Sequence, residues 1–234
     1  MILNVFEHAI SVKRDHESWS EMKFVAHLAR TLNPTMIDGV GNLHFDHRTR
    51  YEGEDSRTLF VAHTDTITRG VGTNQWVKDA KGVYHAQGDT LGADDAAGIA
   101  LLCHLMKTGV PGYYILCRGE EAGGIGSEHL AEVHGELLSE FDRAIAFDRR
   151  GFSDVITHQG GSRCASDEFG EALSTALNDQ GLLYMPCDRG VFTDTANWVD
   201  LIPECTNISC GYDFEHSQKE WQDGNYLSQL GDAV

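Results

Sequence analysis

Four short apolar segments, each followed closely by acidic residues or a histidine, constrain the fold of this chain most strongly. With the polar residues that follow them, they are 59–62 with His63 and Asp65, 113–117 with Glu120 and Glu121, 144–147 with Asp148, and 205–209 with His216. Buried strands have this apolar composition, and open α/β sheets carry their chemistry at the carboxyl ends of strands. The pattern predicts an α/β fold with a functional site at the strand ends.

Two adjacent carboxylates, Asp94 and Asp95, stand just before an apolar run at residues 98–106 that indicates a buried helix. Placing two acids beside a buried helix start is unfavourable unless cations or helix-terminal N–H groups stabilise them. Taken alone, the pair fits a solvated loop or a helix cap equally well. His104, inside the predicted helix, is expected to pack in the core rather than to bind a metal.

Two other pairs of residues, His63 with Asp65 and Glu120 with Glu121, suggest that one member of each pair binds a metal while the other has a different role. Strand alternation puts His63 and Asp65 on the same side, so the carboxylate could hold the second nitrogen of a metal-binding imidazole; an ordinary hydrogen bond at a strand end is the alternative. Glu120 and Glu121 point differently because they are adjacent. One can therefore ligate a metal while the other accepts a proton from the attacking water, as metal-assisted hydrolysis requires. A solvated acidic turn is the alternative there.

Composition restricts the class of protein. The chain has 234 residues and no linker-like segment or internal repeat, which predicts one domain over residues 1–234. Its formal net charge of −18 opposes binding to nucleic acid or to an anionic membrane. No signal peptide and no membrane-spanning stretch are evident. Its six cysteines form no Cys-x-x-Cys pair, which favours buried, reduced thiols in a cytoplasmic protein.

Local patterns place several further elements. Ser18 and Glu21 fit a capping box at the start of a helix that Asn33 and Pro34 stop. The apolar face of this helix is predicted to comprise Trp19, Met22, Val25, Leu28, Ala29 and Leu32. Strands are expected at 36–38, 42–45 and 155–158, a hairpin within 68–87, and a helix near 166–180. His44 and His47 are expected to be solvated.

The combined pattern resembles the co-catalytic zinc aminopeptidase and carboxypeptidase superfamily. The elements that carry the resemblance occur in the family's order between about residues 36 and 221: Asp38-Gly39-Val40-Gly41-Asn42-Leu43, His63-x-Asp65, Gly92-Ala93-Asp94-Asp95-x-x-Gly98, Glu120-Glu121, Gly126-Ser127-x-x-Leu130, Asp148 and His216. The resemblance implies a three-layer α/β sandwich, with a mixed, largely parallel central sheet and helices on both faces.

The resemblance also implies a set of site residues. One ion would be held by His63, Asp94 and Asp148, and a second by Asp94, Glu121 and His216, so that Asp94 bridges the two. Asp65 would orient His63, and Glu120 would be the general acid/base. Two zinc ions suit these ligands, and cobalt or manganese would fit as well. The peptide bond after Asp94 is expected to be cis, as in the family.

One departure from the family concerns the substrate. The segment between Asp148 and His216 is too short for the lid or dimerisation domain that many relatives insert there. Residues that would grip a substrate carboxylate are therefore absent unless Arg149, Arg150 or Arg189 replaces them; simple charge balance is the alternative. Two more candidates are Asp194, which could bind a substrate amine or form an Asx turn, and Tyr212, which could hydrogen-bond a reaction intermediate or only pack.

These observations favour a di-zinc metallohydrolase that cleaves an amide bond, first of all a metallo-aminopeptidase acting on short peptides. An amidohydrolase or deacetylase acting on N-acylated small molecules would need the same metals and base. A catalytically silent metal-binding or peptide-binding module is a third possibility. The second acid, Glu120, argues against the silent module, because binding alone would not require it. The sequence does not predict the oligomeric state.

Overall fold

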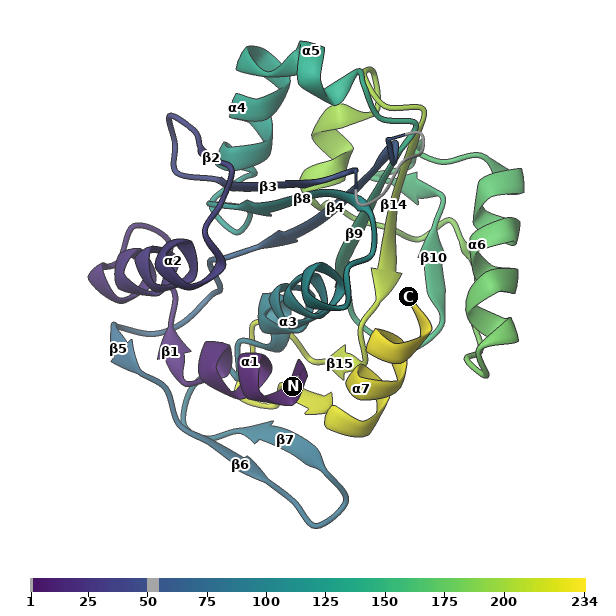
Figure 1. The fold of residues 1–234 in the computed structure, drawn as a ribbon. Helices are drawn as coiled ribbons and strands as arrows, with labels where there is room; N and C mark the ends of the chain where they lie inside the picture. The colour runs from purple at the N-terminus through teal and green to yellow at the C-terminus, as the bar shows by residue number, and fades with distance from the viewer. Residues whose placement is uncertain (1, 50–54) are drawn as a thin grey trace.

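The computed structural model describes residues 2–49 and 55–234. Its centre is an eight-stranded sheet, whose strands lie in the spatial order β13-β10-β14-β9-β4-β8-β3-β2 (Figure 1). In that order, their bounds are Met185–Cys187, Asp154–Ile156, Glu204–Ser209, Arg143–Arg149, Thr58–His63, Gly112–Cys117, Leu43–His47 and Met36–Ile37.

The middle of this sheet is parallel. Strand β4 pairs in parallel with both β8 and β9, and β14 pairs in parallel with β9. Antiparallel pairs join β10 to β14, β3 to β8 and β2 to β3, whereas β13 is parallel to β10. Every residue of β8 is buried, as expected for a parallel strand covered on both faces. The predicted mixed, largely parallel sheet is confirmed.

Helices cover both faces of the sheet (Figure 1). Helix α3 packs on β4 and β9 together with α1 and α7, and α6 packs on β10 and β13, whereas α4, α5 and the 3-10 helix η1 lie on the opposite face. Successive residues of β4 point to opposite faces of the sheet, so that Phe60 belongs to one apolar core and Val61 to the other. The helices are α1 Ile2–Ile10, α2 Trp19–Leu32, α3 Ala93–Thr108, α4 Ile125–Val133, α5 Gly135–Leu138, α6 Asp167–Asp179, η1 Asp194–Trp198 and α7 Gly224–Ala233.

Smaller sheets border the central one. A four-stranded antiparallel sheet has the order β15-β16-β7-β6, and two-stranded pairs join β1 to β5 and β11 to β12. The predicted hairpin within 68–87 contains β6 and β7, and His216 lies in the loop between β15 and β16. The bounds are β1 Val12–Lys13, β5 Gly72–Thr73, β6 Trp76–Lys78, β7 Val83–Ala86, β11 His158–Gln159, β12 Ser162–Arg163, β15 Tyr212–Asp213 and β16 Trp221–Asp223.

Helix α2 begins and ends as predicted, but its buried face is rotated. The Ser18 hydroxyl accepts the Glu21 N–H, and Asn33 ends the helix in the left-handed region. The predicted apolar face is wrong at Trp19 and Met22, which are 49% and 51% exposed. The Glu21 side chain is fully buried instead, because its carboxylate pairs with Arg118 at 2.6 Å.

Two other sequence expectations need correction. Helix α1 was not predicted, although Ile2, Phe6 and Ile10 recur at helical spacing and are buried. His44 was expected to be solvated, and this is wrong: it is fully buried, with contacts to the Tyr113 hydroxyl and the Asp38 carboxylate. His47 is exposed, as expected.

The cysteines agree with the expectation of buried thiols. All six cysteines are buried and free. Among residues 2–49 and 55–234, no helix is both long enough and apolar enough to span a membrane.

Helix α3 packs closely against the sheet at Gly98. A Cβ atom at this position would overlap the Asp95 carboxylate and lie 2.6 Å from the main-chain oxygen of Phe147 in β9. The glycine N–H also donates to Asp95 Oδ1 at 2.8 Å. Only glycine fits here without moving the turn that carries Asp94 and Asp95.

Gly98→Ala should therefore destabilise the fold by about 1–3 kcal/mol, the usual cost of overpacking a core. The matched control is Gly135→Ala in α5, where a Cβ would meet only Leu201 at 3.9 Å. This control should be neutral or slightly stabilising, because alanine favours helix over glycine. Urea unfolding of both variants measures the difference; equal midpoints would contradict the close-approach argument.

Candidate metal centre

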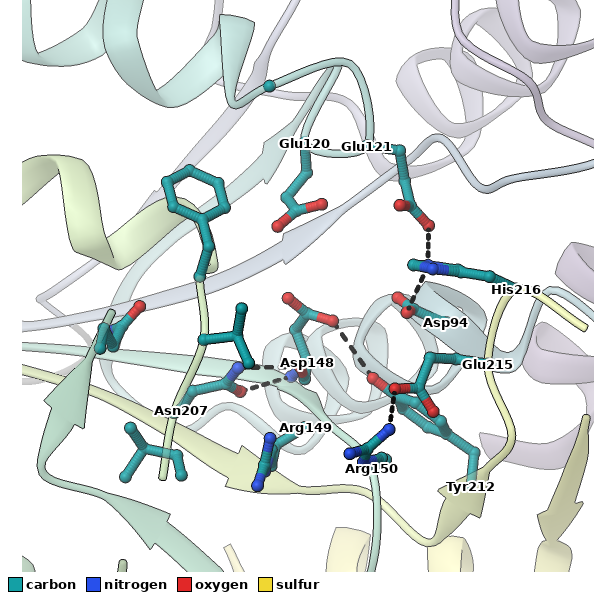
Figure 2. Close-up of a pocket in the computed structure, with 16 residues that line it drawn as sticks. Asp94, Glu120, Glu121, Asp148, Arg149, Arg150, Asn207, Tyr212, Glu215 and His216 are labelled. Carbon is teal, nitrogen blue, oxygen red and sulfur yellow. Dashed lines mark hydrogen bonds and ion pairs between the residues drawn. The ribbon is translucent and has the colours of Figure 1, made fainter. Parts of the chain in front are cut away.

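The parallel strands deliver the predicted site residues to one edge of the sheet. His63 is the last residue of β4, Asp148 lies near the end of β9, and Glu120 and Glu121 follow β8. Asp94 joins them from the start of α3, and His216 enters from the β15–β16 loop. Figure 2 shows Glu120, Glu121, Asp94, Asp148 and His216 around one opening.

The side chains form two groups that share Asp94. His63 Nε2 lies 3.0 Å from Asp94 Oδ1 and 3.5 Å from Asp148 Oδ1. His216 Nε2 lies 2.8 Å from Glu121 Oε1 and 3.3 Å from Asp94 Oδ2. Asp94 thus offers a different oxygen to each group, as a bridging carboxylate does. Each group could hold a metal ion and combines one imidazole with two carboxylates, a donor set that suits zinc.

The charges of these side chains also fit bound cations. Burial raises the pKa of Glu120 to about 10, and the Asp148 and Asp194 carboxylates add to this shift. Burial and the nearby Asp94 raise the pKa of Asp148 to about 7. Hydrogen bonds to Asp94 and Glu121 raise the pKa of His216 to about 11. Without cations these groups therefore hold protons, because their ionised carboxylates would repel one another; two divalent ions would take the place of those protons.

Asp94 is held by main-chain contacts that the sequence did not reveal. The peptide bond between Asp94 and Asp95 is cis, as predicted. The buried Glu220 carboxylate accepts the N–H groups of Gly92, Ala93 and Asp94 at 2.8 to 3.2 Å. Arg14, also fully buried, donates to the Gly92 carbonyl at 3.0 Å. No sequence signal marked Glu220 or Arg14, because both act on a turn remote in the sequence.

Asp65 connects His63 to the loop that carries the two glutamates. The closest contact of His63 Nδ1 is the Asp65 carbonyl at 3.1 Å, with the carboxylate at 3.5 Å rather than in the shorter contact expected. The carboxylate accepts the N–H groups of Gly119, Glu120 and Glu121 at 3.0 to 3.2 Å. Asp65 therefore fixes the main chain of this loop as well as bordering the imidazole.

Two residues that sequence reasoning missed surround Asp148. The Asn207 amide accepts the Asp148 N–H and donates to the Asp148 carbonyl, both at 2.8 Å. The Thr193 hydroxyl donates to Asp148 Oδ2 at 2.6 Å. The Asn207 amide, which can both donate and accept within the strand segment 205–209, was the signal that could have found it. Together these contacts orient Asp148 toward His63.

A cavity of about 360 Å³ opens over the two groups. Ile156, Val191 and Phe192 line it together with the acidic side chains and Tyr212, whose hydroxyl lies 3.2 Å from Asp148 Oδ1. Asp194 does not line this cavity: it is fully buried, so we do not retain it as a contact for a substrate amine.

The arginines near the cavity have acidic partners. Arg149 pairs with Asp154 at 2.9 Å, and Arg150 pairs with Glu215 at 2.8 Å (Figure 2). Arg189 is exposed and is absent from the cavity wall. These contacts agree with the charge-balance alternative.

Comparisons with known proteins identify the fold. No protein-family model matches the chain, and no curated protein matches it. Aminopeptidase PepT from Bacillus cereus aligns with a TM-score of 0.82 and 14% identity, over 100% of this chain and 96% of that one. The chain has the fold of a solved aminopeptidase.

Other solved structures share this aminopeptidase fold. A tripeptidase from Staphylococcus aureus gives a TM-score of 0.76 at 14% identity, over 100% of this chain and 95% of that one. The Pyrococcus horikoshii TET1 peptidase, which can assemble into a tetrahedron or a large octahedral shell, gives 0.72 at 15%, over 100% and 98%.

The shared position of Asp94 gives the metal centre a specific test. Asp94→Asn should lower the number of bound divalent ions by about two relative to the unaltered protein, because both groups lose a charged ligand. His216→Ala should lower it by about one, because His216 belongs to only one group. Elemental analysis after dialysis against zinc measures both. Equal losses in the two variants would show that Asp94 is not shared.

Proposed function

We propose that this protein is a metallo-aminopeptidase that removes the N-terminal residue of short peptides with the help of two zinc ions. The observation that carries this proposal is Asp94, which presents one oxygen to His63 and the other to His216, with Glu120 directed into the same cavity (Figure 2). When bound, such ions polarise an amide carbonyl and make water a better nucleophile at neutral pH. Cobalt or manganese could replace zinc at these ligands.

Glu120 is the proposed general acid/base. Its carboxylate lines the cavity and has no hydrogen-bond partner among residues 2–49 and 55–234, whereas Glu121 contacts His216. An uncommitted carboxylate can accept a proton from the attacking water and deliver it to the leaving amine. Asp65 would act as a positioning residue, because it holds the main chain of Glu120 and borders His63.

The polarity of the cavity favours a free amine over an N-acyl group at the substrate's end. Glu215 lines the cavity, and its Oε2 atom is buried without a partner, while Oε1 accepts from Arg150. A peptide's ammonium group would satisfy this oxygen with a charged donor, whereas an N-acyl group offers only one neutral N–H and so a weaker hydrogen bond. Two solved proteins of the same fold, an aminopeptidase and a tripeptidase, agree with this choice.

The proposal has three further parts, which concern the domain, the cellular compartment and the cavity wall. We propose that residues 1–234 form one catalytic domain, because one continuous sheet joins segments from Met36 to Ser209. The six buried, free thiols support action in the cytoplasm. Tyr212, beside Asp148 in the cavity wall, would hydrogen-bond the tetrahedral intermediate, whereas Arg149 is already paired with Asp154.

The two glutamates should differ when each is changed to glutamine. Glu120→Gln should retain its bound ions while turnover falls by about 10²–10⁴-fold, because the general acid/base is removed. Glu121→Gln should instead lose ion affinity, and high zinc should restore part of its activity. Metal content and turnover are measured on both. If Glu120→Gln loses metal and Glu121→Gln does not, the two roles are reversed.

Substrate class can be tested with paired amides. Aminoacyl amides with a free amine should be hydrolysed by the zinc-loaded protein, and their N-acetyl counterparts should be poor substrates. Glu215→Gln should raise KM for the free-amine substrates about tenfold with little change in kcat, because a charged partner of the ammonium group is lost. The control is Glu171→Gln on the exposed surface of α6. Hydrolysis restricted to N-acyl compounds would favour the amidohydrolase.

A further inference from the structure

A second set of possible metal ligands lies away from the cavity. Asp38, His129 and His134 each offer a ligand atom, and these atoms all lie within 4.8 Å of one another. None of the three lines the cavity at the metal centre. Asp38 lies in the turn between β2 and β3, His129 in α4, and His134 between α4 and α5. The set therefore joins two segments that are far apart in the sequence.

Hydrogen bonds fix the Asp38 side chain in position, as a metal-binding carboxylate requires. Its Oδ1 atom accepts the N–H groups of Val40, Gly41 and Asn42 at 2.9 to 3.1 Å. Its Oδ2 atom accepts from the Asn42 amide at 2.7 Å and has a longer contact, 3.4 Å, with His44. Although burial opposes the charge, these hydrogen bonds lower the pKa of Asp38 to about 2. The Asp38 carboxylate is thus ionised and fixed in place, as a metal ligand requires.

The two histidines lack competing partners. Within residues 2–49 and 55–234, neither the His129 nor the His134 ring has a hydrogen bond, and both side chains are half-buried. Their ring centroids are 5.8 Å apart at 70°. Neither ring comes within ion-pair distance, 4.0 Å, of Asp38, so hydrogen bonding to that carboxylate does not explain the cluster.

The spacing instead leaves room for an ion. Tetrahedral zinc with bonds of about 2.0–2.2 Å places its ligand atoms roughly 3.4 Å apart. The ligand atoms of the set already lie within 4.8 Å of one another, so rotation of the half-buried histidine side chains can bring them to that spacing. Two imidazoles, one carboxylate and water complete a common four-coordinate donor set.

We propose that Asp38, His129 and His134 form a third divalent-metal site, selective for zinc-like ions, that supports the structure. The ion would tie the β2–β3 turn to α4. Asn42 extends this connection, because its amide donates to the Gly126 carbonyl at 3.0 Å and accepts the Arg118 N–H at 2.9 Å. Arg118 stands two residues before Glu120. The site would therefore stabilise the loop that carries the glutamates without taking part in the chemistry.

Zinc binding by the whole chain tests this site. His129→Ala, His134→Ala and the double variant should each bind one zinc ion fewer than the unaltered protein after dialysis. His47→Ala, which removes an exposed histidine of neighbouring β3, should bind the full number. Zinc should raise the Tm of the histidine variants less than that of the His47→Ala control, whereas the metal-free Tm values should match. Equal zinc content in the double variant and the control would overturn the proposal.

A second measurement separates this site from the proposed catalytic pair, and its first step uses no histidine variant. Asp94→Asn, expected to lose the ions of the metal centre, should still bind one zinc ion. Adding His129→Ala to Asp94→Asn should remove that ion. Absence of zinc from Asp94→Asn would overturn the third site, and leave the proposed function untouched.

Discussion

The candidate metal centre depends on how buried carboxylates are stabilised at the carboxyl edge of the parallel strands. An ionised carboxylate without a partner is too costly to bury, so each one needs hydrogen bonds, a cation or a proton. One class is satisfied by main-chain N–H groups: Glu220 binds those of residues 92–94, and Asp65 binds those of residues 119–121. The other class, Asp94, Glu121 and Asp148, faces imidazoles and retains capacity for metal ions. The first class fixes the loops on which the second is carried.

This division explains what the sequence could predict. His63, Glu121 and Asp148 were predictable because they lie at or just after the ends of parallel strands, which meet at one edge whatever the details of packing. Asp94 and His216 lie outside these strands and were assigned from the family resemblance. The supporting residues were not predictable, because their partners are remote: 128 positions separate Glu220 from Gly92. The buried face of α2 differs from the predicted one for the same reason, because it depends on a partner that is remote in the sequence. A local pattern assigned Glu21 to a cap, but its contact with Arg118, 97 positions away, decided which side of the helix is buried.

The ion pairs beside the cavity limit which charged groups of a substrate the protein can bind. Arginines beside an acidic site could bind a substrate carboxylate, but Arg149 and Arg150 already have carboxylate partners. Recruiting either one would leave Asp154 or Glu215 without its ion pair. Glu215, in contrast, has one oxygen that no described residue satisfies. This end of the cavity therefore offers an unpaired hydrogen-bond acceptor, which favours a donor such as an ammonium group on the substrate.

Glu120 and Glu121 show how two adjacent, identical side chains acquire different roles. Asp65 binds the N–H groups of both, so the main chain is fixed at both positions by the same carboxylate. With the backbone fixed, the side chains must diverge. Glu121 reaches His216 at 2.8 Å, whereas Glu120 ends in the cavity near Asp148, whose charge helps to raise the Glu120 pKa. Cations at the ligands would oppose that effect and lower the Glu120 pKa, which would make this carboxylate available as a base. The ligands and the base are thus electrostatically coupled, even though Glu120 is not one of the proposed ligands.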